Sequence, residues 1–262
     1  MIHAQWFGRI SVPESEEVLE DFVRARAVGI SPNVLCIFEH TPTFVYHRWA
    51  KDQHAIRDKL WFDAYCAGYD VTLAQANRGG GMMYHGPGQI VLAPVLKLKS
   101  DFGIPEYAHA LEETMLLALG ELFGIDGFRI RYNETQRLWV TEAGEQVHLF
   151  NDEPRSGVQG VWVFDNNELR KIGFLGSRFK YPEGVISRGC ALNLFPDLDA
   201  FSLIDPCDLP GVNVSSVERL RGFRPKIEGK LAQTIAEIFA EVLIDMGFTN
   251  ERFFQFEDVT KE

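Results

Sequence analysis

Cysteine is the strongest nucleophile that this chain offers, and its four cysteines stand in different surroundings. Cys36 lies in the apolar run VLCIF and Cys66 in an amphipathic segment, so both are predicted to be small core residues. Cys190, in the run RGCALN, could line a pocket, although a core position fits it better. Cys207 follows Pro206 in the turn-rich run IDPCDLPG, where a side chain can reach a cleft. It could act as a nucleophile, but the same context also suits a structural cysteine.

A reactive cysteine needs a cation or a helix N-terminus nearby, because the ordinary thiol pKa of about 8.5 must fall to give a thiolate. Lys171 is a candidate cation, and it opens the run KIGFLGSRF, whose glycines leave the backbone open to a ligand. A lysine on a strand is also commonly a solvated charge. His85 is an alternative base, and a histidine before a glycine turn is commonly structural. These residues by themselves leave both roles open.

The segment 78–89 reads RGGGMMYHGPGQ, and five of its twelve residues are glycine. Glycine permits positive φ and lets a ligand approach the main chain closely. Met82, Met83 and Tyr84 supply apolar surface, whereas Arg78 and His85 supply polar groups. This composition predicts a loop and a short strand that line a pocket for a partly apolar and partly polar ligand.

Metal and nucleotide sites are not predicted. The seven histidines form no HxH or HExxH pattern, and the cysteines form no CxxC pair. The run RGGG lacks the GxxxxGK[ST] phosphate loop, and no GxGxxG follows a predicted strand. The motifs therefore predict neither a bound metal nor a nucleotide site.

The charge of the chain restricts its partners. Its net charge of −11 argues against nucleic-acid binding, which needs a basic surface. The segment 170–188 is the exception, because it holds five basic residues and one acidic residue. We interpret it as a basic surface that could receive an acidic partner, with a solvated strand face as the alternative.

The expected cellular location follows from the absence of secretory and membrane-spanning segments in the sequence. Residues 1–17 lack the basic region and apolar run of a secretory signal, and no apolar run is long enough to span a membrane. Four unpaired cysteines in 262 residues are too few for a disulfide scaffold. We therefore expect a cytoplasmic protein with free thiols and no membrane association.

Hydrophobic periodicity places helices and strands in a mixed order around these residues. Helices are predicted at 14–27, 60–67, 105–123 and 226–246. Strands are predicted at 33–38, 69–75, 89–98, 128–132, 137–141, 158–164, 170–179 and 185–194. Residues 39–49 are predicted as a loop and 142–157 as a polar surface insertion. No linker divides the chain, so we expect residues 1–262 to form one α+β domain with helices packed on mixed sheets.

Four blocks in order, RGGGMMYHGPGQ, KIGFLGSRF, RGCALNL and IDPCD, resemble the octanoyltransferase family, the lipoyl(octanoyl) transferases of lipoic acid synthesis. EHTPTFVYHR at 39–48 and GVW at 160–162 also fit this family, and the similarity covers about 15–220. The resemblance implies the α+β fold of biotin- and lipoate-protein ligases. It also implies transfer of an octanoyl group from acyl carrier protein to a lysine of lipoyl domains, those of 2-oxoacid dehydrogenases and the glycine cleavage H protein.

The resemblance assigns roles to individual residues. It implies that Cys207 carries the acyl group as a thioester, with Lys171 as its catalytic partner and no cofactor. The implied substrate-binding residues are Arg78, Gly79, Gly80, Gly81, Met82, Met83, Tyr84, His85, Phe174, Leu175, Gly176, Gly189, Cys190 and Ala191.

The chain departs from the family at several positions. Met83 stands where threonine is usual, Arg188 where histidine is frequent, and Asp208 where glycine is usual. Two other functions are alternatives: an ATP-dependent lipoate- or biotin-protein ligase, and an acyl-binding protein without catalytic activity.

Overall fold

The computed structural model describes residues 2–47, 53–76, 81–149, 156–180, 183–249 and 254–261. Arg78, Gly79 and Gly80, all predicted to bind substrate, lie outside the described residues.

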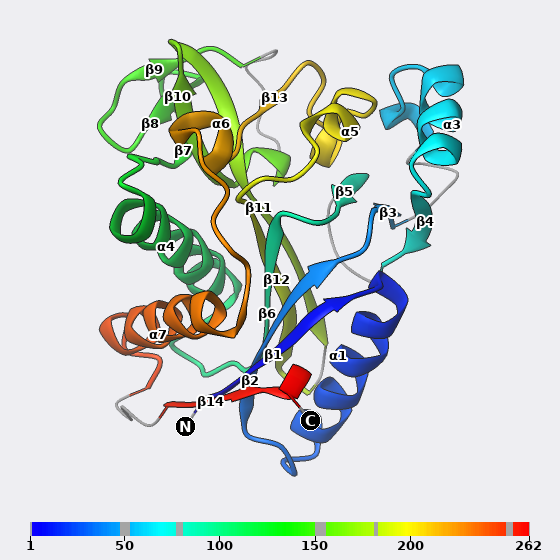
Figure 1. Ribbon diagram of the computed structural model, residues 1–262. Helices are drawn as coiled ribbons and strands as arrows, with labels where there is room; N and C mark the ends of the chain where they lie inside the picture. The colour runs from blue at the N-terminus through cyan, green and yellow to red at the C-terminus, as the bar shows by residue number, and fades with distance from the viewer. Residues whose placement is uncertain are drawn as a thin grey trace.

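A mixed sheet forms the centre of the molecule, with strand order β10-β11-β12-β6-β2-β1-β14 and β13 paired with β11 (Figure 1). β1 pairs in parallel with β2 and β14, whereas β2, β6, β12, β11 and β10 pair antiparallel in succession. The strand bounds are β1 Ile2–Ile10, β2 Asn33–His40, β6 Gln89–Lys97, β10 Gly160–Asp165, β11 Glu168–Lys180, β12 Val185–Asn193, β13 Asn213–Val214 and β14 Phe254–Asp258.

Helices cover both faces of this sheet, which explains why central strands such as β2 and β12 are buried along nearly their whole length. α1 (Val12–Ala27) packs on one face, and α4 (Ile104–Phe123) and α7 (Gly229–Asp245) pack on the other (Figure 1). α1 begins in a capping box, in which Ser11 and Glu14 satisfy each other's backbone N–H groups.

Two small sheets flank the central one. β4 (Thr72–Gln75), β3 (Thr43–Tyr46) and β5 (Met83–His85) form the first, beside α3 (Lys59–Gly68). β7 (Ile130–Asn133), β8 (Leu138–Thr141) and β9 (Gln146–Val147) form the second, near α4. Shorter elements are α5 (Leu198–Ser202), α6 (Val217–Arg221) and the 3-10 turns η1 (Gln53–Ala55), η2 (Ser156–Val158), η3 (Pro206–Asp208) and η4 (Val259–Lys261).

The predicted α+β class with mixed sheets is confirmed, one local prediction is wrong, and two strands were not predicted. The predicted loop 39–49 is wrong in its described part, 39–47, because β2 continues to His40 and β3 follows. Residues 48 and 49 lie outside the described residues. The described part of the predicted surface insertion 142–157 contains the two-residue strand β9 and the start of η2. β1 and β14 were not predicted; they pair with each other although they lie at opposite ends of the chain.

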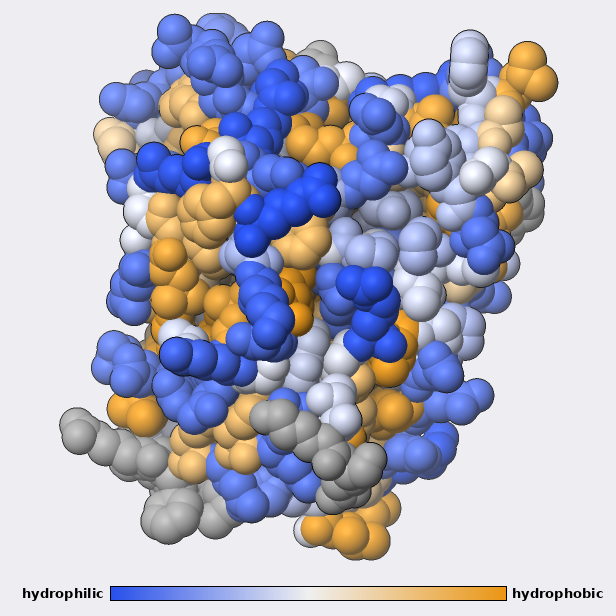
Figure 2. Space-filling view, viewed as in Figure 1, coloured by the Kyte–Doolittle hydropathy of each residue, from blue (hydrophilic) through white to orange (hydrophobic). Residues whose placement is uncertain are grey.

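The face seen in Figure 2 is largely hydrophilic, with apolar surface over α4 and α7 at left and over α3 at upper right. Leu60 and Trp61 of α3 are both exposed. No helix in the described residues is long and apolar enough to cross a membrane.

Candidate active site

Cys207 lies in the short turn η3, where its backbone takes the left-handed conformation (φ 57°). Its N–H donates a hydrogen bond of 3.0 Å to the carbonyl oxygen of Met82, which ties this turn to the glycine-rich segment. Asp205, two residues earlier, accepts a 2.8 Å hydrogen bond from Nε of Arg57. The Cys207 side chain is buried but reaches two pockets.

Lys171 on β11 is completely buried. Its Nζ donates hydrogen bonds to the carbonyl oxygens of Gly157 and Gln159, the latter at 2.7 Å. The same nitrogen lies 5.1 Å from the ring centre of Trp162 and 5.5 Å from that of Phe174. Burial lowers the pKa of Lys171 to about 8. The negative charges of Cys207 and Glu112 oppose that decrease, so this amine can both give and take a proton near neutral pH.

Gly157 brings these two residues together. Its carbonyl oxygen accepts from Lys171 Nζ, and a Cβ placed on it would stand 3.2 Å from the Cβ of Cys207. The charge of Cys207 also acts directly on Lys171. A thiol and an amine from distant parts of the sequence therefore share one buried site.

An apolar pocket leads away from Cys207 along the α1 face of the central sheet. Its floor crosses four neighbouring strands, β11, β12, β6 and β2. Three strand spacings of about 4.8 Å make this floor about 14 Å long. α1 and strands β3 and β5 form the opposite wall. The lining residues are Val12, Ser15, Glu16, Leu19, Phe38, His40, Val45, Ala76, Met83, His85, Val91, Ala93, Phe174, Leu175, Gly176, Arg188, Gly189, Cys190, Ala191 and Cys207. Such a pocket suits a medium-length alkyl chain.

A second pocket reaches Cys207 from the side of α4. It shares Leu175, Gly176 and Cys207 with the first pocket and is otherwise lined by Ile104, Pro105, Tyr107, Ala108, Leu111, Gly157, Gln159 and Ser177. The pairing of β10 with β11 starts at Gly160 opposite Phe174, so β11 has no β10 partner beyond that point. Cys207 therefore borders both pockets, and two different groups can approach it.

Residues 14–240 match the model of the lipoyl protein ligase A/B catalytic domain family. The chain belongs to this family. It is 29% identical over 241 residues to an octanoyltransferase of Chloroflexus aurantiacus, a match that covers 90% of this chain and 92% of that protein. It is 32% identical over 211 residues to an octanoyltransferase of Roseiflexus sp. (strain RS-1), covering 80% and 74%. The predicted family membership is confirmed.

Solved structures of lipoate-protein ligases share the fold. A lipoate-protein ligase A bound with ATP superposes with a TM-score of 0.62 at 14% identity, covering 98% of this chain and 87% of that one. A putative lipoate protein ligase from T. acidophilum with bound lipoic acid gives 0.59 at 14% identity, covering 98% and 88%. The predicted lipoate-ligase architecture of this family member is therefore confirmed.

Eight of the residues predicted to bind substrate line the first pocket of this family member: Met83, His85, Phe174, Leu175, Gly176, Gly189, Cys190 and Ala191. Gly81, Met82 and Tyr84 are buried but are not among its lining residues. The carbonyl oxygen of Met82 accepts the hydrogen bond from the Cys207 N–H, and the ring of Tyr84 packs against Phe44 and Phe201. For these three residues, as for the eight that line the pocket, substrate binding stays a prediction.

Polar groups also line the first pocket. Arg188 is buried and forms ion pairs with Glu16 at 2.5 Å and Glu20 at 2.9 Å, both on α1. Burial lowers the pKa of His40 to about 4, so this imidazole is neutral at pH 7. His85, the alternative base, faces Oε1 of Gln89 through its Nδ1.

The predicted basic surface at 170–188 is wrong. Lys171 and Arg188 are buried, and the other basic residues of the segment face carboxylates. Arg170 pairs with Asp165 and Glu168, Arg178 with Glu20, and Lys180 with Glu183. Because Lys171 and Arg188 are buried and the other three cations pair with carboxylates, this segment offers little positive charge to a partner.

Several site residues were missed by the sequence predictions. The pocket wall on α1 includes Leu19, which the apolar stripe of the predicted helix could have suggested. The carbonyls of Gly157 and Gln159 left no signal in the sequence, since any residue has a carbonyl. Glu112 was missed because a glutamate on a helix is ordinarily exposed, whereas this one is 1% exposed.

Proposed function

We propose that this protein is an octanoyltransferase that carries the octanoyl group as a thioester on Cys207. The donor is octanoyl-acyl carrier protein, and the acceptor is a lysine of a lipoyl domain in a 2-oxoacid dehydrogenase or in the glycine cleavage H protein. The observation that carries this proposal is the meeting of Cys207 and Lys171 at Gly157, beside an apolar pocket. The octanoyltransferase relatives support the choice of acyl group.

In the first step, the Cys207 thiolate attacks the carbonyl carbon of the donor thioester. A new bond forms between Sγ and the carbonyl carbon, and the bond to the donor sulfur breaks. The leaving thiolate takes a proton from the Lys171 ammonium, which leaves a neutral amine. Because one thioester replaces another, the acyl group keeps its reactivity.

In the second step, the amine of the acceptor lysine attacks the acyl group on Cys207. The amide bond forms, the bond from carbon to Sγ breaks, and Cys207 leaves as a thiolate. Neutral Lys171 takes the proton that the attacking nitrogen loses, which restores the starting ion pair. A pKa of about 8 suits both proton transfers at neutral pH.

The two pockets suit the two approaches. The first would hold the octanoyl chain, whose roughly six methylenes at about 0.8 kcal/mol each supply at most about 5 kcal/mol of binding free energy. The second opens beside α4 and would admit the donor's thioester arm and later the acceptor lysine. Since both pockets border Cys207, the chain can stay in place while donor and acceptor exchange.

Intact-protein mass spectrometry after mixing with octanoyl-acyl carrier protein tests the proposal. Wild type should gain the mass of one octanoyl group, and Cys207→Ala should gain none. Cys66→Ala is the control, because it removes another thiol, on α3, that lines neither pocket; it should still form the adduct.

Other outcomes would point elsewhere. An adduct on Cys207→Ala would overturn the assignment of the nucleophile. Lipoylation by Cys207→Ala that requires ATP would indicate a ligase. Binding of the octanoylated carrier by wild type without an adduct or transfer would indicate a non-catalytic acyl-binding protein.

A further inference from the structure

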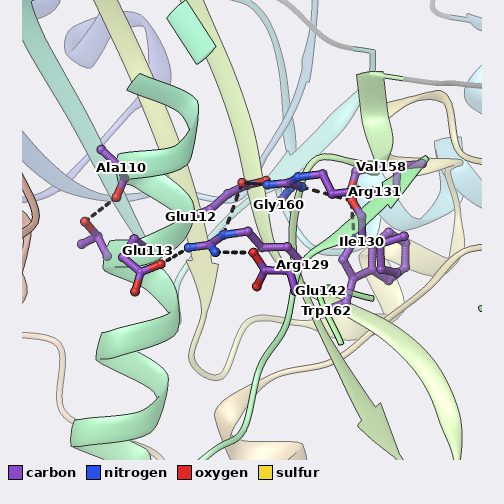
Figure 3. Close-up of polar contacts among 11 residues, drawn as sticks. Ala110, Glu112, Glu113, Arg129, Ile130, Arg131, Glu142, Val158, Gly160 and Trp162 are labelled. Atoms are coloured by element: carbon purple, nitrogen blue, oxygen red, sulfur yellow. Dashed lines mark hydrogen bonds and ion pairs between the residues drawn. The ribbon is translucent and has the colours of Figure 1, made fainter. Parts of the chain in front are cut away.

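We propose that Glu112 is a positioning residue that orients one carbonyl acceptor of Lys171, that of Gln159, through the peptide group between Gln159 and Gly160. This inference rests on the proposed function, because it assigns Glu112 to the control of the proposed general acid and base. Glu112 lies on α4, faces the segment 157–160, and is 1% exposed (Figure 3).

One peptide group connects Glu112 to Lys171. Oε1 of Glu112 accepts a 2.8 Å hydrogen bond from the N–H of Gly160. Lys171 Nζ donates a 2.7 Å hydrogen bond to the C=O of Gln159, which belongs to the same peptide group. Because N–H and C=O point in opposite directions in a trans peptide, the carboxylate and the ammonium lie on opposite sides of it. The carboxylate therefore fixes the orientation of the oxygen that binds the ammonium.

The surrounding backbone leaves this peptide little freedom. Gly160 has φ +126°, and a Cβ on it would stand 2.3 Å from the Gly173 carbonyl oxygen and 3.2 Å from Cε of Lys171. The conformation requires glycine and brings the segment against the lysine side chain. A carboxylate on the N–H also polarises the peptide, which strengthens the bond that its C=O accepts from Lys171.

Glu112 also acts on Lys171 through its charge. The groups that face Lys171 in the described residues are the thiol of Cys207, the carboxylate of Glu112, the carbonyls already named and the rings of Trp162 and Phe174. Burial lowers the pKa of Lys171, and the charges of Cys207 and Glu112 each raise it. Acylation of Cys207 removes one of these charges, so Glu112 is the carboxylate that acts on Lys171 when the acceptor amine attacks.

Two arginines stabilise the charge of Glu112. Arg131 donates to both carboxylate oxygens, one of them at 3.3 Å, and Nε of Arg129 lies 3.6 Å from Oε2 (Figure 3). Arg129 also pairs with Glu113 and Glu142. Burial of a carboxylate is costly unless cations pair with it, and these two arginines supply that pairing. The cluster also attaches the sheet β7-β8-β9 to α4.

Glu112→Gln separates the charge from the hydrogen bond, because the amide oxygen can still accept from Gly160. The rate of single-turnover transfer from the acyl-enzyme to a lipoyl domain, plotted against pH, should bend at the pKa of Lys171. In Glu112→Gln this bend should lie about one pH unit lower than in wild type. Glu112→Ala removes the acceptor as well and should slow both half-reactions more than tenfold at every pH.

Glu113→Gln is the matched control. It removes a neighbouring carboxylate partner of Arg129 but leaves the hydrogen bond to Gly160 intact. It should leave the bend of the pH profile where wild type has it, whatever its effect on stability. If Glu112→Gln and Glu113→Gln give the same unshifted profile, the effect of the Glu112 charge on Lys171 is overturned. If Glu112→Ala transfers the acyl group at the wild-type rate, the positioning role is overturned.

An unfolding measurement tests this inference separately from the proposed function, because it does not depend on catalysis. A double-mutant cycle of Glu112→Gln and Lys171→Met, followed by urea unfolding, needs no substrate. Coupling should be present at pH 7 and smaller at pH 10, where Lys171 loses its proton. Additive effects at both pH values would overturn the inference even if the enzyme forms its thioester. Coupling in a protein that forms no acyl-enzyme would support the interaction between Glu112 and Lys171 and refute the proposed function.

Discussion

Gly157 lies so close to Cys207 that a Cβ added to it would stand 2.2 Å from the Cys207 carbonyl oxygen. The same glycine accepts a hydrogen bond from Lys171 Nζ. The missing side chain at this position is therefore what allows the turn with the thiol and the strand with the amine to meet.

Gly157→Ala should slow acylation of Cys207 by roughly 100-fold, because displacing a catalytic group by about 1 Å costs on that scale. Gly120→Ala is the control: Gly120 is inside α4 with open space around it, and alanine should stabilise the helix by up to about 1 kcal/mol. Stopped-flow acylation and urea unfolding measure both effects. Normal acylation by Gly157→Ala would contradict the proposed role of this close contact.

The pH dependence of acyl transfer should report Lys171. Below its pKa of about 8 the amine is protonated and cannot take the proton of the acceptor, so the transfer rate should rise with pH up to a bend. Acylation of Cys207 removes a charge that raises this pKa, so the bend should lie at or below about 8. Lys171→Met should lose the bend and keep only the dependence that the acceptor lysine itself contributes. Rapid-quench measurement of acyl transfer from preformed acyl-enzyme gives this pH dependence. An unchanged bend in Lys171→Met would show that another group causes the bend.

Burial of Lys171 should also make stability depend on pH. Its pKa is about 8 in the folded state against an ordinary 10.5, so the unfolded chain binds more protons between these values. The free energy of unfolding of wild type should therefore rise with pH between about 8 and 10.5, and Lys171 should contribute about 3 kcal/mol to this rise. Lys171→Met should lack the rise, so its stability relative to wild type should be higher at pH 7 than at pH 10. Urea unfolding at both pH values checks this prediction. An equal difference in stability between Lys171→Met and wild type at pH 7 and pH 10 would contradict it.

Ala93 on β6 lies in the floor of the first pocket, so a larger residue there should shorten the preferred acyl chain. Ala93→Val adds two buried carbons and should disfavour octanoyl relative to hexanoyl by about 1–3 kcal/mol, or roughly 5- to 150-fold in kcat/KM. The ratio of the two substrates within one variant cancels any loss of folded protein. An unchanged ratio would mean that the chain binds elsewhere.

Arg188 should be more important for stability than an exposed arginine with a similar partner. Arg188→Met leaves Glu16 and Glu20 without the buried cation that joins them to β12 and should cost about 2–3 kcal/mol. Arg24→Met removes an exposed pair with Asp21 and should cost less than about 0.5 kcal/mol. Urea unfolding compares the two, and equal costs would show that the Arg188 network contributes nothing beyond a surface pair.

The sequence by itself determined the family, the class of fold and most of the long elements. The blocks around Lys171 and Cys207 identified the candidate pair, and regular spacing of apolar residues located helices such as α1, α4 and α7 within a few residues. These features are local, because side-chain spacing and backbone preference depend on near neighbours in the chain.

Tertiary structure decided the environment of the same residues. β1 and β14 pair across almost the whole length of the chain, and Arg178 and Arg188 pair with glutamates of α1. The pKa of Lys171 depends on burial and on Glu112, which stands on another element. Charge, burial and proximity depend on which distant segments pack together, and short-range patterns in a sequence do not contain that information.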